Sequence, residues 1–254
     1  MRRSFQLVAL VTVALLFAVP AHAQSVDEII AKNLQAKGGL ELLRQTATVK
    51  MSGTFKTFQP SETAMPMTTW AKRPNMLRRE VEVQPPADQG RPAAPSKPVR
   101  MVNGSDGTTS WTQQGSAPAH VLPAAQGAVG PVDSEFDGVF IDYRAKGVTI
   151  NLVGVETLNG KQVYHLSVQR KNAPVQQYFL DKETALEVKV SAEPSQGPSR
   201  AKVDTELSDY RTVDGRVVPF RMRQFVNGAL AAEMVFDRVE FNVPMPDTLF
   251  KIPK

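Results

Sequence analysis

The chain has 254 residues, no cysteine and a formal net charge of +5. The absence of cysteine excludes disulfides, catalytic thiols and thiolate metal sites. Because its lysines and arginines are scattered among acids and form no basic block, we expect no nucleic-acid partner.

The first 23 residues have the pattern of a cleavable export signal. Two arginines precede an apolar run over 7–19, and Ala-His-Ala at 21–23 is the small-x-small motif after which a signal peptidase cuts. The run is too short to stay in a bilayer as a spanning helix. We therefore predict a signal peptide at 1–23, a mature chain from Gln24 and a periplasmic location. No cysteine follows the signal, so we expect no lipid anchor, and loss of the two arginines lowers the net charge from +5 to +3.

The mature chain is predicted to open with an amphipathic helix. Ser25 and Glu28 have the spacing of a capping box, and Gly38-Gly39 is a helix stop. One helical stripe carries the mostly apolar side chains Val26, Ile29, Ile30, Asn33 and Leu34.

From Thr46 the apolar period changes from helical to two, which predicts strands. Val49, Met51, Gly53 and Phe55 alternate with polar residues, as in a strand with one dry face. Further strands are expected at about 62–72, 75–84, 98–103 and 108–113. Between and after them, the segments 84–98 and 114–131 are rich in proline, alanine and glutamine, which predicts exposed loops. By position these loops are candidate lids, although surface insertions are the stronger interpretation.

A second helix is predicted over 133–146. Its apolar side chains are spaced three and four apart, at Phe136, Val139, Phe140 and Tyr143, and a glycine follows at 147. Three acids lie in its expected first turn: Asp133, Glu135 and Asp137. The helix dipole favours acids there, so capping explains them better than a catalytic carboxylate cluster.

The remainder of the chain alternates between strands and short turns. Asn159-Gly160, Asp214-Gly215 and Asn227-Gly228 are hairpin signals. Since no β-α-β alternation occurs, the fold class is mainly β with helices (α+β). We expect one domain over 24–254: a curled antiparallel sheet, or unclosed β-barrel, of about eleven strands covered by the N-terminal helix and the second helix.

Two motifs resemble those of the lipoprotein carrier family, the LolA-like and LolB-like periplasmic proteins. The segment Trp70-Ala71-Lys72-Arg73-Pro74-Asn75-Met76-Leu77 is similar to that family's W-x-K-R-P-N-x-F/L strand pair. Residues 101–111 resemble its V-x-D-G-x-x-x-W hairpin, which ends at Trp111. The order of elements is also similar along nearly all of the mature chain. This chain is longer than the short carriers, which lack the insertion 84–98.

The resemblance implies a function and a site. In that family an apolar cavity binds the acyl chains of lipoproteins and carries them across the periplasm, from an inner-membrane donor to an outer-membrane acceptor. By motif, Arg73 is the residue that bonds to the lid and gates the cavity; the alternative is a solvated surface arginine beside Lys72. A protein of this kind is expected to be a monomer without a cofactor or metal.

Other candidate lipid-binding residues are large or soft apolar side chains on the first strands and the second predicted helix. They are Met51, Phe55, Trp70, Met76, Leu77, Trp111, Phe136 and Phe140. Methionine and aromatic side chains adapt to flexible chains, but ordinary core packing is the alternative for about half of them.

The sequence contains few patterns typical of a catalytic site. The two histidines of the mature chain, His120 and His165, have no second histidine at metal-ligand spacing. No Gly-x-Ser-x-Gly elbow and no glycine-rich phosphate loop are present. The sequence therefore favours a non-enzymatic carrier of lipoprotein or lipid acyl chains, and the alternative is an envelope scaffold of the same fold with a filled cavity.

Overall fold

The computed structural model describes residues 24–59, 61–83, 97–123, 135–171, 173–192 and 201–253. The predicted signal peptide lies outside these residues, as do residues 84–96 of the first predicted loop and 124–131 of the second. None of the helices in the described part of the chain has the length and apolar character needed to span a bilayer.

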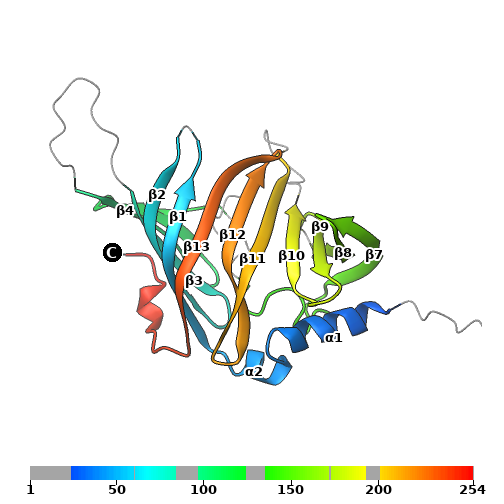
Figure 1. Cartoon of the computed structure of the whole chain (residues 1–254). Helices are drawn as coiled ribbons and strands as arrows, with labels where there is room; N and C mark the ends of the chain where they lie inside the picture. Colours follow the sequence, from blue (N-terminus) through cyan, green and yellow to red (C-terminus); the bar gives the residue numbers. More distant parts are fainter. Residues whose placement is uncertain are drawn as a thin grey trace, which may run out of the picture.

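One antiparallel sheet dominates the structure (Figure 1). Its strands are β1 (Thr48–Thr57), β2 (Thr63–Lys72), β3 (Met76–Val83), β4 (Val99–Ser105), β5 (Ser110–Gln114), β6 (His120–Val121), β7 (Thr149–Leu158), β8 (Lys161–Gln169), β9 (Gln176–Asp181), β10 (Glu187–Ala192), β11 (Val203–Val213), β12 (Arg216–Val226) and β13 (Ala229–Phe241). Their order is β6-β5-β4-β3-β2-β1-β13-β12-β11-β10-β9-β8-β7. Adjacent strands are therefore consecutive in sequence except β1 and β13, and the consecutive strands β6 and β7 lie at opposite edges of the sheet.

The predicted fold class is confirmed, with thirteen described strands in place of about eleven. Part of the difference is β6, two residues inside the segment read as loop 114–131. It pairs with β5 through Val121 opposite Trp111. So short a strand has no period of its own, and only pairing with its neighbour defines it.

The hairpin turns follow the local sequence. Asn159-Gly160, Asp214-Gly215 and Asn227-Gly228 each join two strands through two residues with positive φ. Two-residue turns of this kind match the right-handed twist of the flanking strands, and asparagine, aspartate and glycine tolerate positive φ.

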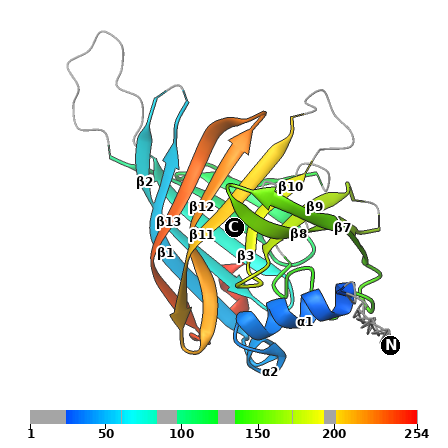
Figure 2. The ribbon, with the colours of Figure 1, turned by 45° about the vertical axis from the view of Figure 1, so that its right-hand side comes forward.

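The opening helix α1 (Val26–Ala36) forms as predicted. Ser25 accepts a hydrogen bond from the Glu28 amide, and the Glu28 carboxylate accepts one from the Ser25 amide. Gly38, at φ 117°, ends the helix where the chain passes the β11–β12 turn, and a Cβ on it would lie 2.5 Å from the Gly215 carbonyl oxygen. The short helix α2 (Leu40–Arg44) follows. Figure 2 shows α1 and α2 lying across one end of the curled sheet.

The second predicted helix is wrong. Residues 136–147 form consecutive turns, which we call the strap. Gly138, Asp142 and Gly147 have φ of 60°, 53° and 70°, which is left-handed backbone that an α-helix does not contain. The strap buries three consecutive side chains, from Val139 to Ile141, where an amphipathic helix would bury one stripe. Tertiary packing has overridden a helical spacing.

The two faces of the sheet carry different side chains. Directly paired residues share a face, so the register identifies each one. Met51 lies opposite Thr69 and Val239, on the face that also packs against α1. We call this the inner face. Trp70 lies opposite Lys50 and Arg78, on the outer face.

Two apolar clusters occupy the inner face. The covered cluster is formed by α1, the strap and the part of the sheet beneath them. It consists of Ile29, Ile30, Val139, Phe140, Val148, Ile150, Tyr164, Leu166, Val168, Tyr178 and Leu180. The methionine cluster lies on the central strands and consists of Met65, Met67, Val81, Phe220, Phe236 and Val239, together with partly buried neighbours that include Met51, Phe55, Met222 and Met234.

The C-terminal segment packs on the outer face. After β13 the chain forms a 3-10 turn, η1 (Asp247–Leu249), and Phe250 is fully buried. The Trp111 indole N–H donates to the Phe250 carbonyl at 3.0 Å, and the ring lies against Gly104, which has no side chain to displace it. This tail therefore forms a small core of its own on the far side of the sheet.

Candidate functional site

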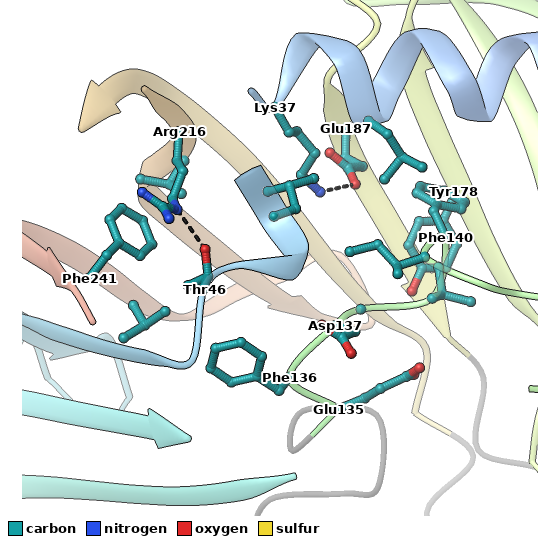
Figure 3. Close-up of a pocket in the computed structure, with 17 residues that line it drawn as sticks. Lys37, Thr46, Glu135, Phe136, Asp137, Phe140, Tyr178, Glu187, Arg216 and Phe241 are labelled. Atoms are coloured by element: carbon teal, nitrogen blue, oxygen red, sulfur yellow. Dashed lines mark hydrogen bonds and ion pairs between the residues drawn. The ribbon is translucent and has the colours of Figure 1, made fainter. Parts of the chain in front are cut away.

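A cavity of about 300 Å³ lies between the two inner-face clusters. It is lined by α1, α2, the strap and strands of the inner face (Figure 3). Its volume is at the lower end of the range of about 300–1,000 Å³ that is usual for ligand pockets.

The apolar wall of the cavity comes from both clusters. Val49, Val218 and Phe241 pack against the methionine cluster and line the cavity. Phe140 and Tyr178 line it from the covered cluster, with their rings edge to face at 5.3 Å between centroids. The cavity therefore lies where the two apolar clusters of the inner face meet.

One polar pair in the wall is the Lys37–Glu187 ion pair, in which the Lys37 ammonium lies 2.7 Å from Glu187 Oε1. It connects the end of α1 to β10. Burial alone would raise the pKa of the Glu187 carboxyl, but the charge and hydrogen bond of Lys37 outweigh it and hold the pKa below its ordinary value. The Glu187 carboxyl is therefore ionised at neutral pH.

A second polar group in the wall is Arg216, at the start of β12. Its Nε donates to Thr46 Oγ1 at 2.6 Å, and its guanidinium lies over the Phe241 ring, 4.7 Å from the centroid (Figure 3). The side chain is buried, with the residue only 5% exposed. It joins the α2–β1 connection to the strands beneath it.

Arg73 lies at the end of β2, where it holds the strap. Its Nη1 lies 2.5 Å from Asp137 Oδ2, and its Nη2 donates to the carbonyls of Leu43 and Thr46 at 3.1 and 2.9 Å. The guanidinium also lies 5.0 Å from the centroid of Phe136. The peptide bond from Arg73 to Pro74 is cis. One side chain thus bridges α2 and the strap beside the cavity.

Other ion pairs tie the strap at its remaining points. Glu135, just before it, lies 2.5 Å from Lys146 and 3.0 Å from Arg170. Two further side chains bond to the N-terminal helices: Asp142 to Arg44 at 2.7 Å, and Arg144 to Asp27 at 2.7 Å.

These pairs change the interpretation of the acids near the strap. Hydrogen bonds from Arg144 and Tyr143 hold the pKa of Asp27 below its ordinary value. Glu135 and Asp137 were expected to cap a helix, and that expectation is wrong because they pair with Arg170 and Arg73 on other elements. Asp133 lies outside the described residues.

Five of the predicted apolar site residues lie on the inner face or at the cavity. Phe136 and Phe140 line the cavity. Met51 and Phe55 pack against the methionine cluster, and Leu77 is buried on the same face, opposite Ala71.

The other three predicted residues do not face the cavity. Trp70 is on the outer face, and Met76 shares that face because it lies opposite Lys72. Trp111 is fully buried under the C-terminal tail. The sequence does not show which face of the sheet a side chain on a strand occupies, because the face depends on the register. From sequence alone, Trp70, Met76 and Trp111 are therefore grouped with Met51.

The sequence reasoning missed Lys37, Glu187 and Arg216. No spacing connects these residues, because the cavity assembles them from α1, β10 and β12. The one usable signal was the Asp-Gly turn before Arg216, which marks it as the first residue of a strand. In the described residues, no cluster of three or more histidines, aspartates and glutamates could hold a metal ion.

Comparison with known proteins identifies the fold. No family model matches the chain, and no curated protein matches it. Three crystal structures are similar over most of their length: a putative outer membrane lipoprotein-sorting protein domain from Vibrio parahaemolyticus (TM-score 0.59, 13% identity, 88% of this chain and 95% of that one), a LolA superfamily protein from Nitrosomonas europaea (0.58, 12%, 90% and 98%) and a DUF1329 family protein from Desulfovibrio piger (0.59, 11%, 89% and 97%). This protein therefore has a LolA-like fold.

Proposed function

We propose that this protein is a periplasmic carrier that binds the acyl chains of lipoproteins or lipids and moves them to the outer membrane. The observation that supports the proposal is the cavity between two apolar clusters on one face of the sheet. A core that binds no ligand would be expected to fill this cavity with its own side chains, since protein interiors pack to the density of organic crystals.

The energetics suit a carrier. An acyl chain of about a dozen methylenes gains about 10 kcal/mol on leaving water, at about 0.8 kcal/mol for each methylene. The cavity alone is small for such a chain, but the methionine cluster adjoins it through Val49, Val218 and Phe241. Unbranched thioether side chains can repack around an inserted chain at low cost.

Arg73 is the proposed gate. Its contacts with Asp137, Leu43 and Thr46 hold the strap to α2, so breaking them would free one wall of the cavity. The site proposed for acyl chains consists of Met51, Phe55, Leu77, Phe136 and Phe140 together with Val49, Val218 and Phe241. Donor and acceptor proteins in the two membranes complete the proposal.

Native mass spectrometry tests the carrier role. The full gene is expressed, and the exported protein is purified from the periplasm without detergent and extracted for lipid. A discrete adduct of acyl-chain mass is expected, on a chain that begins at Gln24. A clean apo mass with no uptake of added dodecanoate or triacylated lipopeptide would contradict the carrier and favour the scaffold with a filled cavity.

A cavity-filling variant links that adduct to the site. Val218→Phe places a larger side chain in the cavity wall and is expected to remove most of the adduct. The matched control, Val153→Phe, makes the same change on the edge strand β7, where the side chain is 57% exposed. Equal loading of the two variants would show that the lipid binds elsewhere.

The gate is tested by unloading. Arg73→Leu is expected to bind a fluorescent triacylated lipopeptide but to transfer it to acceptor vesicles at an altered rate. The control Arg100→Leu removes an exposed arginine that pairs with Glu80, remote from the strap. If Arg73→Leu loads and unloads like the parent, Arg73 is no gate.

A further inference from the structure

The charged side chains that the fold buries differ in whether they have an oppositely charged partner. Among the described residues, the buried charged side chains are Asp181, Glu187, Arg216 and Glu233. Three have an oppositely charged partner: Asp181 has Lys161 at 3.4 Å, Glu187 has Lys37 at 2.7 Å, and Glu233 has Arg221 at 3.4 Å. Arg216 has no carboxylate within ion-pair distance in the described part of the chain, and it is the one of the four that carries its charge unpaired.

The contacts of Arg216 leave it able to bind an anion. Its three nitrogens donate to neutral oxygens, namely Thr46 Oγ1 at 2.6 Å and the carbonyls of Asp214 and Leu42 at 3.0 and 3.3 Å. These bonds use three of the five N–H groups of a guanidinium. A buried charge without an opposite charge is costly, so a place beside it attracts one.

The surroundings of the cavity are also electropositive. Counting the described side chains in its wall and those paired with them, five cations face three carboxylates: Lys37, Arg73, Lys146, Arg170 and Arg216 against Glu135, Asp137 and Glu187. The three carboxylates are each engaged in an ion pair. One of the two excess positive charges lies at Glu135, which has both Lys146 and Arg170 as partners. The other lies at Arg216, which an anion would balance.

The apolar wall begins directly beside this charge. Phe241 stacks under the guanidinium, and Val49 and Val218 line the same cavity and contact the methionine cluster. A molecule with one anionic end and one apolar chain would satisfy both parts of the wall at once.

We propose that Arg216 binds the anionic headgroup, a carboxylate or a phosphate, of an amphiphile whose apolar chain lies against Val49, Val218 and Phe241. The inference rests on the proposed carrier function and specifies the class of ligand. A guanidinium suits both headgroups because its planar N–H fork can bond two oxygens together.

A headgroup series tests the proposal without altering the protein. Delipidated full-length mature protein is titrated by calorimetry with dodecanoate, dodecyl phosphate, dodecan-1-ol and dodecyltrimethylammonium, each below its micellar concentration. At least one anion is expected to bind about 10-fold or more tightly than the alcohol, which is typical of a hydrogen bond to a charged group. The tighter of the two anions identifies the headgroup.

Variants locate the preference at Arg216. Arg216→Met is expected to lose the roughly 10-fold preference for the anion while it still binds the alcohol, and Arg216→Lys to retain part of the preference. The control Arg221→Met removes an arginine of the same strand that is half exposed and pairs with Glu233, and it should behave like the parent.

The outcomes separate the two proposals. Binding of all four chains with equal affinity would overturn the headgroup inference and leave the carrier function standing. Binding of none would overturn both. An anion preference that persists in folded Arg216→Met would assign the headgroup to another cation. If Arg216→Met does not fold, the headgroup series measured on the parent and on Arg216→Lys tests the inference instead.

Discussion

The covered cluster and the methionine cluster share one face of one sheet, yet they are built differently. The covered cluster contains branched and aromatic side chains, of which Leu166, Val168 and Leu180 are fully buried beneath α1 and the strap. The methionine cluster includes Met51, Met65, Met67, Met222 and Met234, and three of these are only partly buried. Branched side chains specify one packing, whereas methionine tolerates several. The comparison indicates that one end of the inner face is packed to specify one arrangement, and that the other end has side chains that would adapt to the ligand proposed above.

The largest expected effect lies in the covered cluster. Leu166→Ala removes a side chain with no exposed surface and should lower the free energy of unfolding by about 4 kcal/mol, through lost burial and the cavity that remains. Urea denaturation followed by circular dichroism measures this. Met234→Ala is the comparison in the methionine cluster, where partial burial predicts a loss of about 1–2 kcal/mol. Equal losses would remove the distinction between the clusters.

The next effect concerns the attachment of α1 to the covered region. Lys37→Met leaves the buried Glu187 carboxylate without its partner and should cost about 3 kcal/mol, at the lower end of the range for broken buried pairs because Lys37 is 29% exposed. Thermal and urea unfolding check the value. Lys161→Met is the control, since it removes a lysine that is far more exposed. A loss no greater than that of the control would mean that the pair contributes little.

The same pair predicts a dependence on pH. Because the folded pKa of Glu187 is lowered below 4.5, its contribution to stability is fully present above about pH 4.5 and is lost as the pH falls through the folded value. The free energy of unfolding of Glu187→Gln should therefore fall less steeply than that of the parent below pH 4.5. Urea titrations at several pH values compare the slopes, and parallel curves would contradict the assignment.

The smallest effect on stability is expected in the methionine cluster. Met222 and Met234 face each other across β12 and β13, and replacing both with leucine conserves most of their volume. The free energy of unfolding should change by less than about 1.5 kcal/mol for each substitution. Dodecanoate uptake should fall, since branched side chains repack less readily. If both dodecanoate uptake and the free energy of unfolding are unchanged, binding of the ligand does not depend on the flexibility of these methionine side chains.

Local chemistry accounts for most of the elements that the sequence predicted. The capping box at Ser25 and the Asn227-Gly228 turn depend on residues within four positions of each other, and both form. The strap shows the limit of this reasoning. Phe136, Val139, Phe140 and Tyr143 have helical spacing. In the structure the consecutive residues Val139, Phe140 and Ile141 are all buried, and packing of this kind replaced the helix with turns.

The sequence by itself determined the sheet, the opening helix and the alternation of dry and wet faces, because period and turn chemistry act over short distances. Only the tertiary structure decided which face of the sheet each side chain occupies. Trp70 and Trp111 lie on the outer face, and Met51 lies on the inner face. It also brought Lys37, Glu187 and Arg216 into one cavity wall. The reason is physical: such contacts depend on register and on how the sheet curls, and both are set by packing between residues that are distant in the chain.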